Sequence, residues 1–346
     1  MIKEMSSYER IVCALERKQP DRVPFYEGVI DTRVMEGIAP GMDYYDFVDW
    51  FGLDVVGLNR SSWGKEDIKF LDAEQTIFKD HWGVTRKINQ ERTPYPIDGP
   101  IKSREDLKHY TPPDPNAPHL LGNLSDVVKR FKGKKAIIWT GRDAFFNPSY
   151  LRGVEDFLMD FVCDPALVHD LIELCLDFDI ALTRRAIRAG VDIVVLGDDY
   201  AWNEGPMMSR KHFQEFILPG LRRAVQAVHE EGAFCVKHTD GNIMPIIDLI
   251  VDTGIDAINP IEPAAGMDIG KVKKLFGDRV AVIGNIDCGE LLSRGTVDQV
   301  KKAVKDCIEV ASPGGGHILA SSNSIHSSVK PENYKAMRDA CFDYKM

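Results

Sequence analysis

The segment VDIVVLGDD, residues 191–199, is a mostly apolar run, rich in β-branched residues, that ends in two adjacent carboxylates. Such a run is typical of a strand buried on both faces, because a half-exposed strand would alternate apolar with polar residues. The flanking segments have helical character: an Asp–Pro pair begins residues 164–190, and residues 209–232 carry apolar residues at helical spacing. Helix, buried strand and helix in succession indicate a parallel sheet covered by helices.

The same alternation continues on both sides of this strand. Segments of strand character are centred near residues 24, 55, 137, 194, 235, 257, 282 and 318. Eight strands that alternate with helices predict a (β/α)8 barrel, the TIM barrel of the α/β class. A doubly wound open sheet is the alternative, but no GxGxxG turn follows any of these strands.

Residues 60–133 interrupt the alternation between the second and third strands. Within them, residues 75–88 favour a small antiparallel hairpin, and residues 95–118 are rich in proline. We therefore expect residues 1–346 to form a single barrel domain with an irregular insertion at 60–133.

Composition argues against several classes of protein. The formal net charge is −10, so an extended basic face for nucleic acid is not expected. The seven cysteines form no CxxC pair, as is usual for reduced thiols in the cytoplasm. The N-terminus lacks the apolar core of a signal peptide, and no apolar run has the length of a membrane span. We expect a soluble, cytoplasmic protein.

Polar residues follow the ends of the predicted strands, which is where such barrels carry their catalytic groups. They are Glu27, Asn59, Arg60, Arg142, Asp143, Asp198, Asp199, His238, Asp240, Glu262, Asn285, Asp287, Ser321, Asn323 and His326. Turn and cap formation explains a single Asn or Asp at such a place, but it does not explain Arg, His and Glu there. The group as a whole predicts a functional site at the carboxyl end of the barrel.

Two short motifs in this group have chemical meaning. Asp198 and Asp199 face opposite ways if the strand persists, so only one enters the site, either capping a loop or acting as a metal ligand or proton relay. His238 and Asp240 would share one side. They could bind zinc, or the carboxylate could hold the imidazole in one tautomer. A third ligand must come from another strand, and Glu262 is the nearest in order.

Five segments together resemble the uroporphyrinogen decarboxylase superfamily. They are SYERIVCALERKQPDRVPF (7–25), GDDY (197–200), KHTDGNIMPIIDLIVDTGIDAINPIEP (237–263), GNIDCGELLSRGT (284–296) and SSNSIHSSVKPENYKAM (321–337). The resemblance covers nearly the whole chain and is weakest at 60–133. It implies a (β/α)8 barrel and one of two chemistries, which are porphyrinogen decarboxylation and methyl transfer with a corrinoid protein.

Departures from the family patterns favour methyl transfer. The decarboxylases carry an arginine-rich MRQAGRY loop, where this chain has only Arg33, and a final NLGHG, which SSNSIH (321–326) replaces. The coenzyme M methyltransferases hold zinc with His-x-Cys and a later PGC. This chain keeps His238 but has Asp240 and Gly315 in place of those cysteines. Oxygen ligands suit an ether substrate better than a thiol, as in the O-demethylase branch that the chain resembles.

The resemblance thus implies a methyltransferase that demethylates a small methoxylated or methylated substrate. The methyl group would pass to a separate corrinoid protein, because the chain has no cobalamin-binding DxHxxG pattern. Zinc would be held by His238, Asp240 and Glu262, with Asp198 or Asp199 in catalysis. The residues expected to bind the substrate are Glu27, Arg142, Tyr200, Asn285, Asn323 and His326.

Three further points stay open at this stage. The chain could be a metal-free decarboxylase of a small or porphyrinogen-like acid, with Asp198 or Asp199 stabilising a protonated substrate beside His238. It could also be a non-catalytic binding barrel, although the concentration of ionisable groups at the strand ends argues against that. A homodimer is an alternative to a monomer.

Overall fold

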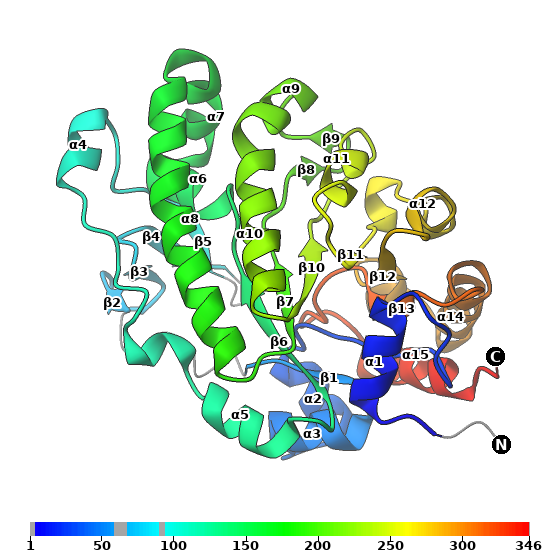
Figure 1. Cartoon of the computed structure of the whole chain (residues 1–346). Coiled ribbons are helices and arrows are strands. Elements are labelled where there is room, and N and C mark those ends of the chain that lie inside the picture. Colours follow the sequence, from blue (N-terminus) through cyan, green and yellow to red (C-terminus); the bar gives the residue numbers. More distant parts are fainter. Residues whose placement is uncertain (1–3, 59–67, 90–93, 346) are drawn as a thin grey trace.

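A curled parallel sheet lies at the centre of the computed structural model, which describes residues 4–58, 68–89 and 94–345 (Figure 1). The strands follow one another in the order β1-β6-β7-β10-β11-β12-β13. Their bounds are β1 (Val55–Val56), β6 (Ala136–Gly141), β7 (Ile193–Leu196), β10 (Phe234–His238), β11 (Ala257–Asn259), β12 (Ala281–Ile286) and β13 (His317–Ser321). Every neighbouring pair in this sheet is parallel, as a βα barrel requires.

The segment around Phe25 closes the sheet into a barrel. The N–H of Tyr26 donates to the carbonyl of Leu319 in β13 (2.9 Å), and the N–H of Asp54 donates to the carbonyl of Phe25 (2.9 Å). Phe25 and Leu319 also form an isolated parallel bridge. The segment is thus the first of the eight predicted strands. The seven strands and this bridging segment occupy the eight predicted positions, and the predicted (β/α)8 barrel is confirmed.

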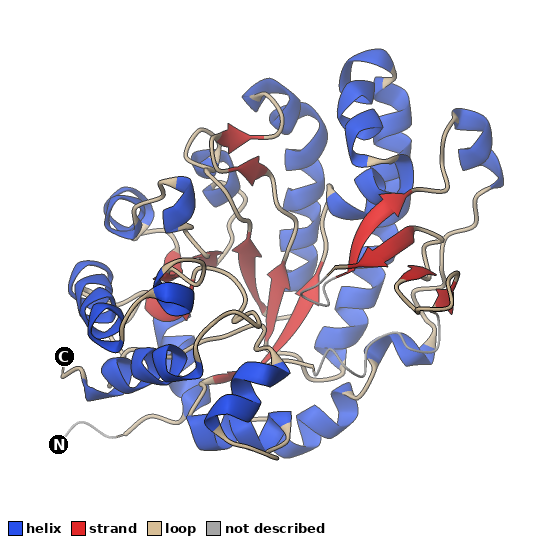
Figure 2. Ribbon diagram, turned by 180° about the vertical axis from the view of Figure 1, so that it is seen from behind, coloured by secondary structure: helices blue, strands red, loops and turns tan. Residues whose placement is uncertain are grey.

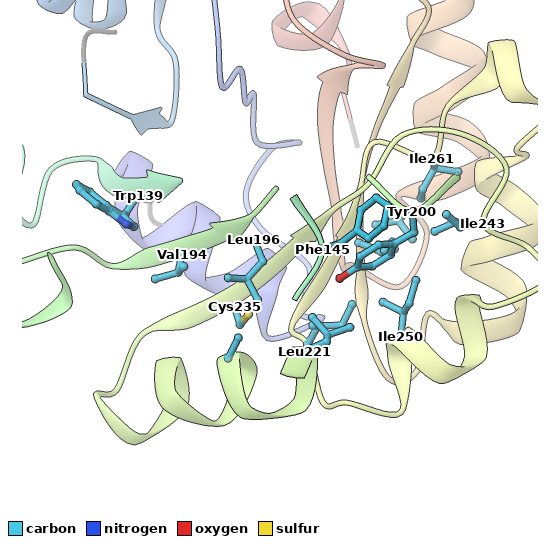
Figure 3. Close-up of a cluster of buried hydrophobic side chains, with 14 of the residues drawn as sticks. Trp139, Phe145, Val194, Leu196, Tyr200, Leu221, Cys235, Ile243, Ile250 and Ile261 are labelled. Carbon is cyan, nitrogen blue, oxygen red and sulfur yellow. The ribbon is translucent and has the colours of Figure 1, made fainter. Parts of the chain in front are cut away.

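The barrel strands are buried on both faces, as their continuous apolar runs predicted. On β7, Ile193 and Val195 belong to the apolar cluster inside the barrel. Val194 and Leu196 belong to the cluster between the sheet and the helices, where they lie with Leu221 of α10 (Figure 3). Burial of each such side chain stabilises the fold by about 1.5–3 kcal/mol. The strands are therefore firmly packed, which fixes the positions of their carboxyl ends.

Helices surround the sheet and connect its strands (Figure 2). They are α1 (Ser7–Leu15), α2 (Thr32–Ile38), α3 (Tyr44–Phe51), α5 (Leu124–Phe131), α6 (Phe146–Arg152), α7 (Val154–Cys163), α8 (Pro165–Arg188), α9 (Arg210–His212), α10 (Leu218–Glu230), α11 (Ile247–Val251), α12 (Ile269–Phe276), α13 (Leu291–Arg294), α14 (Val297–Ala311) and α15 (Pro331–Asp343), with the short 3-10 helices η2 (Pro118–Leu121) and η4 (Pro263–Ala265). Thr296 and Gln299 form a capping box at the start of α14. Within the described part of the chain, no helix combines the length and the apolar character that crossing a membrane requires.

The helix predicted over residues 209–232 is interrupted by a wider turn. A π-helical segment, η3 (Phe213–Ile217), separates α9 from α10. Pro219 lies in the first turn of α10. Proline has no N–H to donate and its ring collides with the preceding turn of an α-helix, so the wider π turn accommodates it without ending the helix.

The insertion contains more regular structure than the sequence predicted. Its strands β2 (Lys69–Phe70), β3 (Ile77–Lys79), β4 (Thr85–Ile88) and β5 (Pro94–Asp98) form an antiparallel sheet, followed by α4 (Arg104–His109). The predicted hairpin is the β3–β4 pair. The ring of Trp82 packs on Phe178 of α8, with centroids 4.7 Å apart, so this sheet is joined to the barrel. Asn59 and Arg60 lie outside the described residues.

Candidate metal centre at the carboxyl end of the barrel

The loop that follows β10 is held by three neighbouring elements. Successive N–H groups of residues 239–241 donate to the carbonyl of Asn259 (2.9 Å), to Oδ1 of Asp199 (2.9 Å) and to Oε2 of Glu262 (2.8 Å). These acceptors come from the ends of β7 and β11 and from the segment after β11. The motif HTDG is therefore a turn whose backbone is fixed from outside.

Gly241 explains why this turn can lie so close to the preceding strand connection. Its φ is +84°, a conformation that residues with a Cβ rarely adopt, and an added Cβ would lie 2.5 Å from the carbonyl oxygen of Ala201. Ala201 begins the small hairpin of β8 (Ala201–Trp202) and β9 (Gly205–Pro206). The N–H of Asn242 donates to the carbonyl of Trp202 (2.9 Å), which ties the two loops together.

His238 presents one defined ring nitrogen to the carboxylates. Its Nδ1 lies 2.6 Å from Oδ1 of Asn259, whose Nδ2 donates to the carbonyl of Ile283 (3.3 Å). The amide oxygen of Asn259 can only accept, so Nδ1 of His238 carries the proton. Nε2 then faces Oδ1 of Asp240 at 3.5 Å and Oδ1 of Asp199 at 3.8 Å.

Three side chains meet the geometric requirement for a metal ion. One ligand atom from each of Asp199, His238 and Asp240 can be chosen so that all lie within 4.8 Å of one another. Atoms that bind zinc at about 2.0–2.2 Å in a tetrahedron lie roughly 3.3–3.6 Å apart, close to the separations observed here. Oδ1 of Asp240 is buried and has no hydrogen-bond partner among the described residues. A divalent cation would satisfy that oxygen, so the donor set fits a metal.

The second oxygen of Asp240 is held in place. Nδ2 of Asn323 donates to Oδ2 of Asp240 at 2.5 Å. Burial raises the pKa of Asp240 to about 6, and the charges of Asp199 and Glu262 act in the same direction, while His238 and Asn323 act against it. Three carboxylates so close together are costly without a cation, which again favours a metal.

Asp198 points away from this cluster, as the strand alternation required. Its Oδ2 accepts from the N–H groups of Asp143 (3.3 Å), Phe145 (3.0 Å) and Phe146 (2.9 Å). The side chain is completely buried. Asp198 thus orders the loop after β6, which is the capping alternative, whereas Asp199 lies in the candidate metal cluster of Asp199, His238 and Asp240.

Lys237 and Asp143 form a buried ion pair beneath the site. Nζ of Lys237 donates to Oδ2 of Asp143 (2.8 Å) and to the carbonyls of Leu196 (3.2 Å) and Asp198 (2.8 Å). Tyr200 donates from its hydroxyl to Oδ1 of Asp143 (2.6 Å) and lies among buried apolar side chains (Figure 3). This network joins the ends of β6, β7 and β10. Lys237 was not expected from the sequence, because no motif spacing relates it to Asp143. A lysine within the apolar run AFCVKH is unusual in a buried strand, and this could have indicated a buried ion pair.

The other residues predicted to bind substrate have partners of their own. The buried Glu27 accepts from the N–H (2.9 Å) and hydroxyl (2.8 Å) of Ser321, and burial raises the pKa of Glu27 to about 8. Nδ2 of Asn285 donates to the carbonyl of Ile261 (3.0 Å). Nδ1 of His326 accepts from the N–H of Ser328 (3.3 Å).

The structure therefore brings together part of the predicted set. Asp199, His238 and Asp240 converge, and Asn323 donates to Asp240. Glu262, which was predicted as a metal ligand, is not part of this group and accepts from the amide of Gly241 next to it. Asp198, Tyr200 and Glu27 are buried and make hydrogen bonds elsewhere. Arg142 lies beside the cluster, with Nη1 donating to the carbonyl of Gly197 and lying 3.5 Å from Oδ1 of Asp198.

Comparison with known proteins agrees with this architecture. A family model described as uroporphyrinogen decarboxylase (URO-D) matches residues 71–344. The chain belongs to the uroporphyrinogen decarboxylase family. The match includes every residue of the metal cluster and the loop that carries it.

Relatives within this family have two different names. A uroporphyrinogen decarboxylase of Psychromonas ingrahamii is 25% identical over 258 residues, which cover 71% of this chain and 70% of that protein. A methylated-thiol–coenzyme M methyltransferase of Methanosarcina mazei is 25% identical over 226 residues, which cover 65% of this chain and 58% of that protein. A solved structure of a methyltransferase from Methanosarcina mazei has a TM-score of 0.76 and 19% identity, and the match covers 98% of this chain and 99% of that one. The family fold thus extends along the whole chain, and the named relatives are enzymes of two kinds.

Proposed function

We propose that this protein is a methyltransferase that takes a methyl group from a small methylated or methoxylated compound and passes it to a corrinoid on a separate protein. The observation that carries the proposal is the convergence of Asp199, His238 and Asp240 around a buried, unpartnered carboxylate oxygen. The similarity to a protein named as a methyltransferase supports it. The corrinoid is assigned to a partner because the sequence contains no DxHxxG pattern.

The chain's own residues have distinct parts in holding the metal. We propose that Asp199, His238 and Asp240 bind zinc, with Glu262 as the candidate fourth ligand because one of its oxygens already fixes the amide of Gly241. Zinc, when bound there, would supply Lewis acidity toward the oxygen or other heteroatom that bears the methyl group. Asn259 orients the imidazole, and Asn323 holds Oδ2 of Asp240, so that Oδ1 would be the oxygen available to a metal.

The charges at the strand ends argue against a porphyrinogen substrate. Asp199, Asp240 and Glu262 are acidic, and they would repel a molecule that carries eight carboxylates. Arg33, the arginine of the loop where the decarboxylases carry several, is 55% exposed and lies 3.8 Å from Asp31. A small acid remains the substrate of the second candidate function, a metal-free decarboxylase, which the similarity to named decarboxylases favours.

Metal analysis is the first test. Protein purified without chelators should contain one zinc per chain by mass spectrometry, and His238→Gln and Asp199→Asn should each lower that content severely. The matched control is His109→Gln, because His109 is an exposed residue of α4, remote from the cluster in sequence. Full zinc in His238→Gln, or none in the wild type after zinc supplementation, would count against the metal centre.

Methyl transfer is the second test. The wild type, loaded with zinc, should methylate reduced cobalamin from at least one member of a panel of methoxyarenes and methylamines, followed by the change in the cobalamin absorption spectrum. His238→Gln should not. Absence of transfer from the whole panel, together with release of carbon dioxide from a small acid, would favour the decarboxylase instead. Absence of both activities would favour a binding barrel.

A further inference from the structure

Arg142 has donors that nothing in the described part of the chain uses. Its side chain is 35% exposed at the end of β6, next to the strand that carries Asp199. Nη1 donates to the carbonyl of Gly197 and lies 3.5 Å from Oδ1 of Asp198. No described residue accepts from Nε or Nη2. These two atoms form one edge of the guanidinium, the edge that binds a carboxylate with two parallel hydrogen bonds.

An aromatic stack fixes the orientation of this guanidinium. It lies over the ring of Phe146, 4.9 Å from the centroid. Phe146 and Tyr150 are one helical turn apart on α6, and their rings stack at 5.0 Å and 24°. Arg86, from strand β4 of the insertion, lies over the other ring at 5.0 Å and is paired with Asp80. With one face and one end of the guanidinium of Arg142 occupied, the Nε–Nη2 edge is the part left for a ligand.

The hydroxyl of Tyr150 is a second candidate donor, on the ring that stacks against Phe146. No hydrogen bond to another described residue is present at that hydroxyl. Burial raises the pKa of Tyr150 to about 12, so the group is protonated at neutral pH and can donate. The positive charge of Arg142 lowers the pKa of Tyr150, and the negative charge of Asp199 raises it. Both residues are therefore near enough to Tyr150 to affect it electrostatically.

We propose that Arg142 and Tyr150 form a subsite for the carboxylate of an aromatic methyl donor, with Phe146 as the apolar surface behind it. The inference rests on the proposed function and narrows its substrate class to methoxylated aromatic acids. The carboxyl end of the barrel then has two poles, a cationic one at β6 and the metal cluster at β7 and β10. An aromatic acid that binds with its carboxylate at Arg142 presents its methoxy end to the metal cluster, and methylamines lack the group that this subsite recognises.

The experiment measures binding, so it needs no corrinoid. Zinc-loaded protein is titrated by calorimetry with 3- and 4-methoxybenzoate and with the matching neutral methoxybenzamides, which have nearly the same shape. The wild type should bind at least one acid tighter than its amide by about 10- to 100-fold, the range expected for charge-assisted hydrogen bonds. Arg142→Gln should abolish that preference while leaving the affinity for the amide within about threefold, and Tyr150→Phe should reduce it in part.

Two controls separate recognition from folding. Arg223→Gln removes an arginine of α10 that pairs with Glu173 on α8, and it should keep the preference for the acid. Arg142→Lys keeps the charge but loses the two-pronged edge, so it should retain only part of the preference. The proposal is overturned if the wild type binds acid and amide equally, or if Arg142→Gln weakens both to the same extent. A clear preference for the acid without any methyl transfer would contradict the proposed function but support the carboxylate subsite. Methyl transfer from methylamines alone would support the proposed function but contradict the subsite.

Discussion

Nδ1 of His238 and Oδ1 of Asn259 lie 2.6 Å apart, on the neighbouring strands β10 and β11. This contact gives the imidazole a single tautomer and turns Nε2 toward the carboxylates of Asp199 and Asp240. A metal ligand that is oriented by a second residue loses affinity when that residue is removed, even though the ligand itself remains.

Replacement of Asn259 by alanine should therefore weaken zinc binding by about 10- to 100-fold. Asn259→Asp keeps an acceptor at the same position and should retain most of the affinity. Competition with a chromogenic chelator measures both values. Equal affinities for the wild type and Asn259→Ala would show that the imidazole is oriented by something else.

Glu27 should make the protein less stable as the pH rises from 4.5 to about 8. Its pKa is raised from 4.5 to about 8 by burial, so the folded state holds a proton that the unfolded chain has lost. The stabilising effect of this proton is complete below pH 4.5 and is lost as the pH rises through 8. The loss amounts to a few kcal/mol, on the order of 1.4 kcal/mol for each pH unit of the shift.

The variant Glu27→Gln should remove this dependence. Glutamine keeps nearly the same size and an acceptor for the N–H of Ser321, but it has no proton to titrate. Urea denaturation at pH 7 and pH 9 should show the wild type losing more stability than the variant over that interval. A parallel loss in both proteins would contradict the assignment.

His317 should set the acid limit of the fold. It is buried at the start of β13, with the hydroxyl of Ser312 2.7 Å from Nδ1 and the carbonyl of Gly284 3.2 Å from Nε2. Burial lowers the pKa of His317 from 6.5 to about 4. The unfolded chain takes up a proton at a higher pH than the folded one, so this contribution is complete above pH 6.5 and is lost as the pH falls through 4.

The corresponding measurement is a urea titration between pH 7 and pH 4. His317→Gln should be less stable than the wild type at pH 7, because it disturbs a buried hydrogen-bonded site, but its stability should fall less steeply with acid. The exposed variant His109→Gln should follow the wild type. An unchanged slope in His317→Gln would exclude His317 as the titrating group.

Removal of one partner of the ion pair between Lys237 and Asp143 should lower the free energy of unfolding strongly. Both side chains are completely buried, so Lys237→Met leaves the carboxylate of Asp143 without its cation and should cost about 3–5 kcal/mol. Adding Asp143→Asn should recover part of that loss, because the uncompensated charge is gone. Additive losses in a double-mutant cycle would mean that the two residues do not interact as the structure shows.

The fold was predictable because its signal is repeated. Eight apolar runs alternating with helical segments leave few architectures, and the shortest strand, around Phe25, was recognisable by its place in that order. The insertion was less predictable, since its strands hold one another in an antiparallel sheet and show no strong pattern individually. The π turn before Pro219 was not predicted from the helical spacing of residues 209–232, because its form depends on the packing around it.

The sequence predicted most of the residues of the candidate site, but it did not predict all of the contacts between them. His238 and Asp240 could be placed on one side by strand geometry, but which of Asp198 and Asp199 joins them depends on the register of β7 against β10. Glu262 was expected as a metal ligand and lies next to the cluster, where its Oε2 accepts a hydrogen bond from the N–H of Gly241. The network of Lys237 brings together strands that are distant in sequence, so no local spacing could have indicated it.

The turn at residues 239–241 has an evolutionary consequence. Each of its three amides is anchored to an acceptor that lies outside the turn, so the path of the main chain does not depend on the side chain at position 240. A substitution at position 240 can therefore replace an oxygen ligand by a sulfur ligand while the main chain keeps its position. A barrel built in this way can change the ligand type at its candidate metal site without a change in the scaffold.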